Sequence, residues 1–241
     1  MAVSATRRPP TRMCRSRPGS RNASAPTRWL PKDMESPAKT RILVLMVCVG
    51  VIWGVSGFAL VFNNQYLLYH LAVIPREFGS LPGIIGMPFV HGSWWHLVSN
   101  TMPLLILGGM VMFRGIRYFG AVTFMIMLLG GILLWCFGRS AAHIGASGLA
   151  FGYLGFLVTR GFYERSWQSI GVAALVVFLY GGMIFGVVPR SDGVSWEAHL
   201  FGLLAGIVVA RVAFGLERNR QQALADQDGT HAGPARIDLE S

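Results

Sequence analysis

The chain is poor in the residue types that solubilise or cross-link ordinary domains. Charged residues make up 13% of its 241 residues and hydrophobic residues 53%, whereas a soluble domain is about 25% charged. This balance excludes a soluble globular protein and predicts a membrane protein. The three cysteines, Cys14, Cys48 and Cys136, form no CxxC pair and no Cys/His cluster. We therefore expect no disulfide framework, no metal site and no cofactor.

Acidic residues are also scarce, with 11 Asp and Glu against 21 Lys and Arg, so the formal net charge is +10. A basic balance of this size can indicate a nucleic-acid partner, but its distribution argues against one. Ten of the 21 basic residues precede residue 42, and the apolar stretches are almost free of them. The excess is better explained by membrane topology and by binding to membrane lipids.

Residues 1–41 are rich in Arg, Pro and Ser, and their prolines prevent a continuous helix. They are therefore predicted to form a disordered basic tail. A mitochondrial transit peptide is the alternative, although the prolines would break the amphipathic helix that it needs. Met34 is an alternative start. At the other end, the polar residues 215–241 are predicted to form a second disordered tail.

Six apolar stretches lie between the tails and predict an all-α, polytopic membrane domain over residues 42–214. A full helical crossing takes about 20 residues. The fourth stretch is short, unless it continues to Tyr163 or begins below the membrane surface, which is tolerated only where it lines a protein cavity. The predicted spans are residues 42–62, 95–113, 119–137, 147–160, 169–188 and 197–214.

The basic residues between the spans predict the orientation. With the N-terminus inside, each of the three outer loops carries one basic residue, namely Arg76, Arg139 and Arg190. The inner segments carry more, which predicts that both termini are cytoplasmic in a multi-pass protein of the plasma membrane. The first outer loop, near residues 63–94, is long and semi-apolar, and we expect it to form a re-entrant or interfacial element.

Polar residues mark the starts of the second, fourth and sixth spans, which begin on the same side of the membrane. Polar groups inside a membrane are costly, so each is a candidate for function. Ser147, in the sequence Gly145-Ala146-Ser147-Gly148, is a candidate nucleophile at a helix N-terminus, where free N–H groups can stabilise an oxyanion. The alternative is simple helix packing through the small residues Gly148 and Gly152.

His199 starts the sixth span and is a candidate general base for a serine on a neighbouring helix. Gly202 and Gly206 lie on the face of His199 and would allow that helix to approach closely. The alternative is an interfacial histidine that bonds only a loop.

His96 and Asn100 are spaced i, i+4 and project from one face of the second span. They are candidate donors to an oxyanion, together with the backbone N–H of Ser147; the alternative is a simple interhelical bond. His91 is expected to anchor the outer loop at the membrane interface. His143 belongs to no pattern.

Three motifs together resemble the rhomboid family of intramembrane serine proteases. They are PFVHGSWWHLVSN with His96 and Asn100, IGASGLAFGYLG with Ser147, and SWEAHLFGLLAG with His199. The resemblance covers residues 42–214 and implies the compact six-helix bacterial form, with a water-filled cavity that opens outward. It also implies a Ser147–His199 dyad, with His96 and Asn100 in the oxyanion hole, that cleaves single-pass transmembrane substrates.

One residue departs from the family pattern. Many rhomboids have a tyrosine four residues after the serine, beneath the histidine ring, and this chain has Phe151. Because ring stacking needs no hydroxyl, we expect activity to persist.

Two other classes stay open. A catalytically dead relative would bind transmembrane clients, but such proteins lose the serine or the histidine. A transporter or channel would need paired charges or broken helices near the midplane, whereas the only acidic residue of the predicted spans is Glu197, at an end. The sequence assigns no oligomeric state.

Overall fold

The computed structural model describes residues 37–189 and 194–231. These ranges are helical, and their one β-bridge joins Val73 to His143. The all-α prediction is confirmed. The helices are α1 (Ala38–Val61), α2 (Gln65–Leu71), α3 (Gly83–Gly86), α4 (Trp94–Met112), α5 (Ile116–Phe137), α6 (Ser147–Glu164), α7 (Trp167–Tyr180) and α8 (Trp196–His231), with the 3₁₀ segments η2 (Phe78–Ser80), η3 (Met87–Phe89) and η4 (Gly181–Val187).

Six of these helices, α1 and α4 to α8, coincide with the six predicted apolar stretches. Five are long and apolar enough to cross a membrane: α1, α4, α5, α7 with η4, and α8. The helix α6 is not among them, because its small and polar residues, with Arg160 and Glu164 in its last turns, make its 18 residues too polar on average. Its neighbours rather than lipid surround it, and 12 of its 18 residues are buried. The chain is therefore an all-α polytopic membrane protein with α6 at the centre of its bundle.

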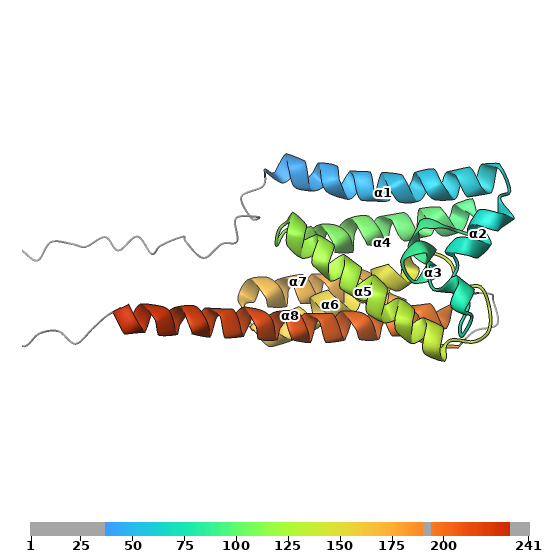
Figure 1. Cartoon of the computed structure of the whole chain (residues 1–241). Helices are drawn as coiled ribbons and strands as arrows, with labels where there is room; N and C mark the ends of the chain where they lie inside the picture. The colour runs from blue at the N-terminus through green and yellow to red at the C-terminus, as the bar shows by residue number, and fades with distance from the viewer. Residues whose placement is uncertain (1–36, 190–193, 232–241) are drawn as a thin grey trace, which may run out of the picture. The chain divides into compact units, whose positions relative to one another are not determined.

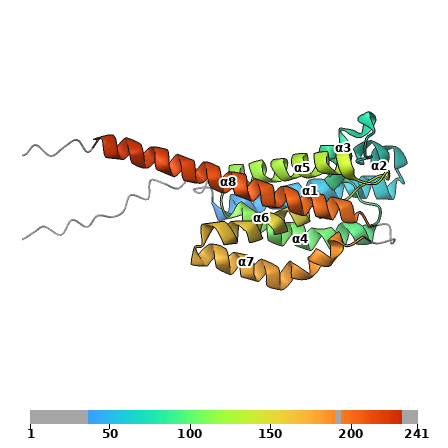
Figure 2. The same ribbon diagram turned by 90° about the horizontal axis from the view of Figure 1, so that it is seen from below.

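Helix α6 packs most extensively against α8, and the two lie side by side in both views (Figures 1 and 2). Glycines make this contact unusually close. A Cβ on Gly202 would lie 2.0 Å from the carbonyl oxygen of Gly148, and one on Gly206 would lie 2.0 Å from that of Gly152. The sequence predicted that Gly202 and Gly206 allow a close approach, and the structure confirms it. The approach fixes the register of α6 against α8.

Helices α4, α6 and α8 all begin at the end of the bundle where α2 and α3 lie (Figure 1). The long loop between α1 and α4 is folded there, as predicted. Ile84 of α3 is buried, and a Cβ on Gly131 of α5 would lie 2.7 Å from its Cγ2 atom. The loop therefore packs on α5 at this end of the bundle.

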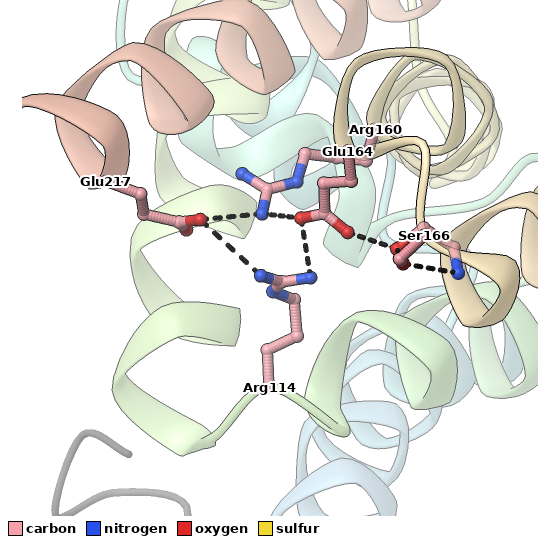
Figure 3. A network of polar contacts seen from close by, with 6 residues as sticks. Arg114, Arg160, Glu164, Ser166 and Glu217 are labelled. Carbon is pink, nitrogen blue, oxygen red and sulfur yellow. Dashed lines mark hydrogen bonds and ion pairs between the residues drawn. The ribbon is translucent and has the colours of Figure 1, made fainter. Parts of the chain in front are cut away.

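The opposite end is held by alternating charges (Figure 3). The Arg160 guanidinium, whose side chain is 4% exposed, pairs with Glu164 and lies 2.7 Å from Glu217 Oε2. Arg114 lies 2.8 Å from Glu164 Oε1 and 3.5 Å from Glu217 Oε2. Glu164 also accepts a hydrogen bond from Ser169 of α7. Two positive and two negative charges thus join the α4–α5 loop to α6, α7 and α8.

The C-terminal prediction needs a correction. Residues 215–241 were expected to be disordered, but α8 continues to His231 and extends past its neighbours (Figures 1 and 2). This segment is polar, yet it is rich in Ala, Leu, Gln, Glu and Arg, which favour helix. Its Glu217 is also held by Arg160. Residues 232–241 and the basic tail up to residue 36 lie outside the described residues.

The glycine contact predicts a position-specific loss of stability. Gly206→Ala should lower the free energy of unfolding by at least about 2 kcal/mol, because its Cβ meets backbone and the helices must separate. Gly215→Ala is the matched control on the same helix, where a Cβ meets nothing within 4 Å; it should be neutral or stabilising. Thermal unfolding in detergent micelles measures both, and equal effects would contradict the packing argument.

Candidate functional site

Ser147 and His199 meet at the α2–α3 end of the bundle. Ser147 is the first residue of α6, and His199 lies in the first turn of α8. The Ser147 Oγ lies 2.8 Å from His199 Nε2. Ser147 is half-buried, whereas His199 is only 7% exposed. The structure therefore brings together the two residues that the sequence singled out on separate spans.

A glycine places Ser147 at the start of its helix. Gly145 has φ +111°, a conformation that L side chains rarely adopt. A Cβ there would lie 2.6 Å from His96 Cε1, so the ring of His96 also needs a glycine at this position. The Gly145 N–H donates to the Met87 carbonyl at 2.9 Å, which ties the segment to the α3–α4 loop.

His91 ties Ala146, the residue before Ser147, to the same loop. It is completely buried, and its Nε2 accepts a hydrogen bond from the Ala146 N–H at 3.3 Å. Its Nδ1 lies 2.8 Å from Ser56 Oγ, which donates to the Phe89 carbonyl at 2.8 Å. Since Nε2 accepts, the proton of the neutral ring lies on Nδ1 and is donated to Ser56. His91 anchors the loop as predicted, but in the interior rather than at the membrane interface.

His96 and Asn100 line the same pocket as Ser147 and His199, so the structure brings all four predicted residues together. Asn100 is 6% exposed, and its Nδ2 donates to the His96 carbonyl at 2.9 Å, which leaves its second N–H for another acceptor. The pocket has a volume of about 420 Å³. It is lined by His96, Ser99, Asn100, Pro103, Ser147, Phe151, Tyr180, Met183, Val194 and His199.

The His199 ring is held on its face and at both nitrogens. Phe151 stacks against it with ring centroids 4.2 Å apart and an interplanar angle of 6°, so stacking persists without a tyrosine hydroxyl. The Nδ1 atom of His199 lies 2.9 Å from the carbonyl oxygen of Gly186, in η4. The contact with Gly186 could not be predicted from the sequence, because a backbone acceptor has no signature in the side chains.

A polar cluster fixes the start of α8. The Ser195 Oγ accepts from the Ala198 N–H at 3.2 Å, as a helix N-cap does, and lies 2.6 Å from His143 Nδ1. His143 Nε2 contacts the Arg139 carbonyl at 3.0 Å, and Arg139 Nε pairs with Glu197 Oε1 at 3.4 Å. Burial lowers the pKa of His143. These roles were not predicted, because neither His143 nor Ser195 belongs to a motif that indicates a partner.

The arrangement is suited to nucleophilic chemistry. A serine hydroxyl faces a histidine nitrogen, and the first N–H groups of α6 have no acceptor within the helix. These N–H groups and the Asn100 amide are available to a developing negative charge beside Ser147. Within residues 37–189 and 194–227, no group of three or more His, Cys, Asp or Glu side chains could hold a metal ion.

Comparisons with known proteins point to one family. The Rhomboid domain model matches residues 79–216, which include all four site residues. An uncharacterized protein of Mycobacterium tuberculosis is 39% identical over 153 residues, covering 60% of this chain and 64% of that protein. An uncharacterized protein of Mycobacterium leprae is 42% identical over 146 residues, covering 56% and 57%.

A named relative lies further away. Rhomboid-like protease 5 of Toxoplasma gondii is 28% identical over 144 residues, covering 55% of this chain and 16% of that protein. The chain thus spans less than two thirds of the length of each of these relatives.

The burial of His91 predicts a pH-dependent stability. Burial, with a smaller contribution from the charge of His96, lowers the pKa of His91 to about 4 from 6.5. Between these values the unfolded chain binds a proton that the folded chain does not, so stability falls as the pH drops from 6.5 to 4. The full shift corresponds to roughly 3 kcal/mol.

The free energy of unfolding at pH 7 and pH 4.5, measured in detergent, tests this expectation. His91→Gln should show a shallower loss than the unchanged chain, while His143 keeps part of the slope. His70→Gln, at an exposed position on α2, is the control and should keep the full slope. Identical slopes in all three proteins would contradict the assignment.

Proposed function

The chain belongs to the rhomboid family, and we propose that it is an intramembrane serine protease, which hydrolyses peptide bonds in or near the transmembrane helices of other proteins. The observation that carries the proposal is the 2.8 Å contact between Ser147 Oγ and His199 Nε2 at the edge of a pocket. A nucleophile within hydrogen-bond reach of a base, itself oriented by a third group, is the signature of an activated serine.

The reaction divides into two acyl-transfer steps. In the first, Ser147 Oγ attacks the scissile carbonyl while its proton passes to His199 Nε2. The tetrahedral intermediate collapses when His199 returns that proton to the leaving amine, so the peptide bond breaks and an acyl-serine remains. In the second, a water gives its proton to His199 and attacks the ester, and the carboxylic acid product leaves as Ser147 regains its proton.

The oxyanion of each intermediate needs donors that are already in place. The Ser147 N–H at the start of α6 is one, and the free N–H of Asn100 is another. His96 lines the same pocket and is the third candidate donor. Removing one such donor from an oxyanion hole typically costs about 2.7–4 kcal/mol in the transition state.

The position of the pocket suggests the substrate class. Ser147 lies at the start of a helix, and the pocket is lined by side chains of helices that cross a membrane. A substrate helix hides each carbonyl in an i to i−4 hydrogen bond, so it must unwind to be cut. We therefore propose single-pass membrane proteins as substrates, with Gly, Pro or small polar residues near the cut, since Gly and Pro weaken a helix by about 1 and 3 kcal/mol relative to Ala.

Substitutions at the site test the proposed function. Ser147→Ala and His199→Ala should each abolish cleavage of a transmembrane substrate, because members of a nucleophile–base unit fail together. Ser147→Ala should also abolish labelling by a fluorophosphonate probe. Asn100→Ala should lower turnover without preventing that labelling, because Asn100 stabilises the transition state of cleavage and is not part of the nucleophile–base pair. Residual cleavage within about tenfold of the unchanged chain in either dyad variant would overturn the dyad.

We also propose that the protein lies in the plasma membrane with both termini cytoplasmic and the pocket open to the outer face. The support is the excess of basic residues before α1 and at the end of the bundle that contains Arg114, Arg117 and Arg160. Tags at either terminus of the full chain should be protected from protease added to intact cells. Cleavage of a terminal tag under these conditions would contradict the orientation.

A further inference from the structure

The carbonyl of Gly186 lies where a catalytic histidine needs an orienting acceptor. Its oxygen is 2.9 Å from His199 Nδ1, on the opposite side of the ring from Ser147. The carbonyl is free to accept because the 3₁₀ segment η4 ends at Val187 and Val188 is extended. Seven residues of 3₁₀ helix are an unusual length, and this run aims the end of the α7 segment at the ring.

Stacking alone does not fix the base. The nearly parallel Phe151 ring sets the plane of the imidazole, but a stacked ring can still rotate within that plane. Hydrogen bonds at both nitrogens remove that freedom, with Ser147 at Nε2 and Gly186 at Nδ1. An acceptor at Nδ1 also keeps the proton there, so Nε2 is free to receive the serine proton.

The space around the ring explains why residue 186 is a glycine. A Cβ at this position would lie 2.8 Å from Phe151 Cζ and 3.1 Å from His199 Nδ1. Neither ring can yield alone, because the two are stacked on each other. A methyl group here would therefore move the base itself.

We propose that the Gly186 carbonyl is the third group of the catalytic unit, and that it positions His199 as a carboxylate does in a serine protease triad. The carbonyl accepts the Nδ1–H, selects the tautomer in which Nε2 is the base, and stabilises the imidazolium that forms when the serine proton is transferred. Gly186 is a positioning residue, since it acts through His199 and not on the substrate. The proposal rests on the proposed protease function.

A matched pair of substitutions tests the steric part. Gly186→Ala and Gly182→Ala make the same change in the same 3₁₀ segment, but a Cβ at Gly182 meets nothing within 4 Å. Gly186→Ala should slow the reaction of Ser147 with a fluorophosphonate probe by at least about tenfold, and Gly182→Ala should leave it unchanged. Equal rates in the two variants would overturn the proposal.

The tautomer of His199 tests the hydrogen bond and needs no variant that disturbs the fold. Nitrogen-15 NMR of the full chain with labelled histidine, in detergent micelles, distinguishes a protonated ring nitrogen from an unprotonated one. The His199 signals are those lost in His199→Gln. Near neutral pH, Nδ1 should carry the proton and Nε2 should not; Gly186→Ala should shift this pattern and Gly182→Ala should not. A proton on Nε2 in the unchanged chain would overturn the proposal, even if Gly186→Ala failed to fold.

The two experiments separate this proposal from the protease function. If the unchanged chain fails to react with the probe at Ser147, the protease function is wrong and the catalytic role of Gly186 falls with it. If the unchanged chain reacts but Gly186→Ala behaves as Gly182→Ala, the protease stands and the third group is wrong.

Discussion

The contact between the backbones of α6 and α8 is the constraint on which the site depends. Gly202 and Gly206 touch the carbonyls of Gly148 and Gly152, so the two helices are closer than any side chain would permit. Small residues are the usual means of close helix approach in membranes, where no hydrophobic driving force acts between helices. Because Ser147 and His199 lie in the first turns of these helices, a shift of one helix along the other by a single residue, about 1.5 Å, would break their contact.

Anchors at the two ends of the bundle complement that contact. At the site, the Ala146 N–H donates a hydrogen bond to the buried His91, and Ser195 caps the start of α8. The first turns of α6 and α8 are therefore fixed independently. At the other end, Arg160 pairs with Glu217 and joins the last turns of α6 to α8. The Arg160 side chain is only 4% exposed, so a shift of α8 that removed Glu217 would leave part of its charge without a partner, which opposes such a shift.

Much of this arrangement is predictable from the sequence. The spacing of His199, Gly202 and Gly206 indicates one close-packed face, and alternate spans place their starts at one end of the bundle. The prediction that the chain is disordered from residue 215 was wrong, because hydropathy indicates where a chain leaves the membrane and not where its helix ends. The contacts of His91 and Gly186 could not be predicted, because they join distant segments and depend on backbone groups that carry no residue signature.

The span formed by α7 and η4 is the least buried of the five, yet it contacts one nitrogen of the His199 ring. Only 6% of an apolar 18-residue stretch of α7 and η4 is buried inside the protein, against 39% of the corresponding stretch of α4 or α5. Yet the carbonyl of Gly186, at the end of this segment, accepts a hydrogen bond from His199 Nδ1, while Ser147 at Nε2 belongs to α6, in which 12 of 18 residues are buried. The His199 imidazole thus contacts the central helix α6 through one nitrogen and a peripheral segment with few protein neighbours through the other. Because local stability follows the amount of packing, the nucleophile is the better fixed of the two partners, and the orientation of the base depends on how firmly η4 is held.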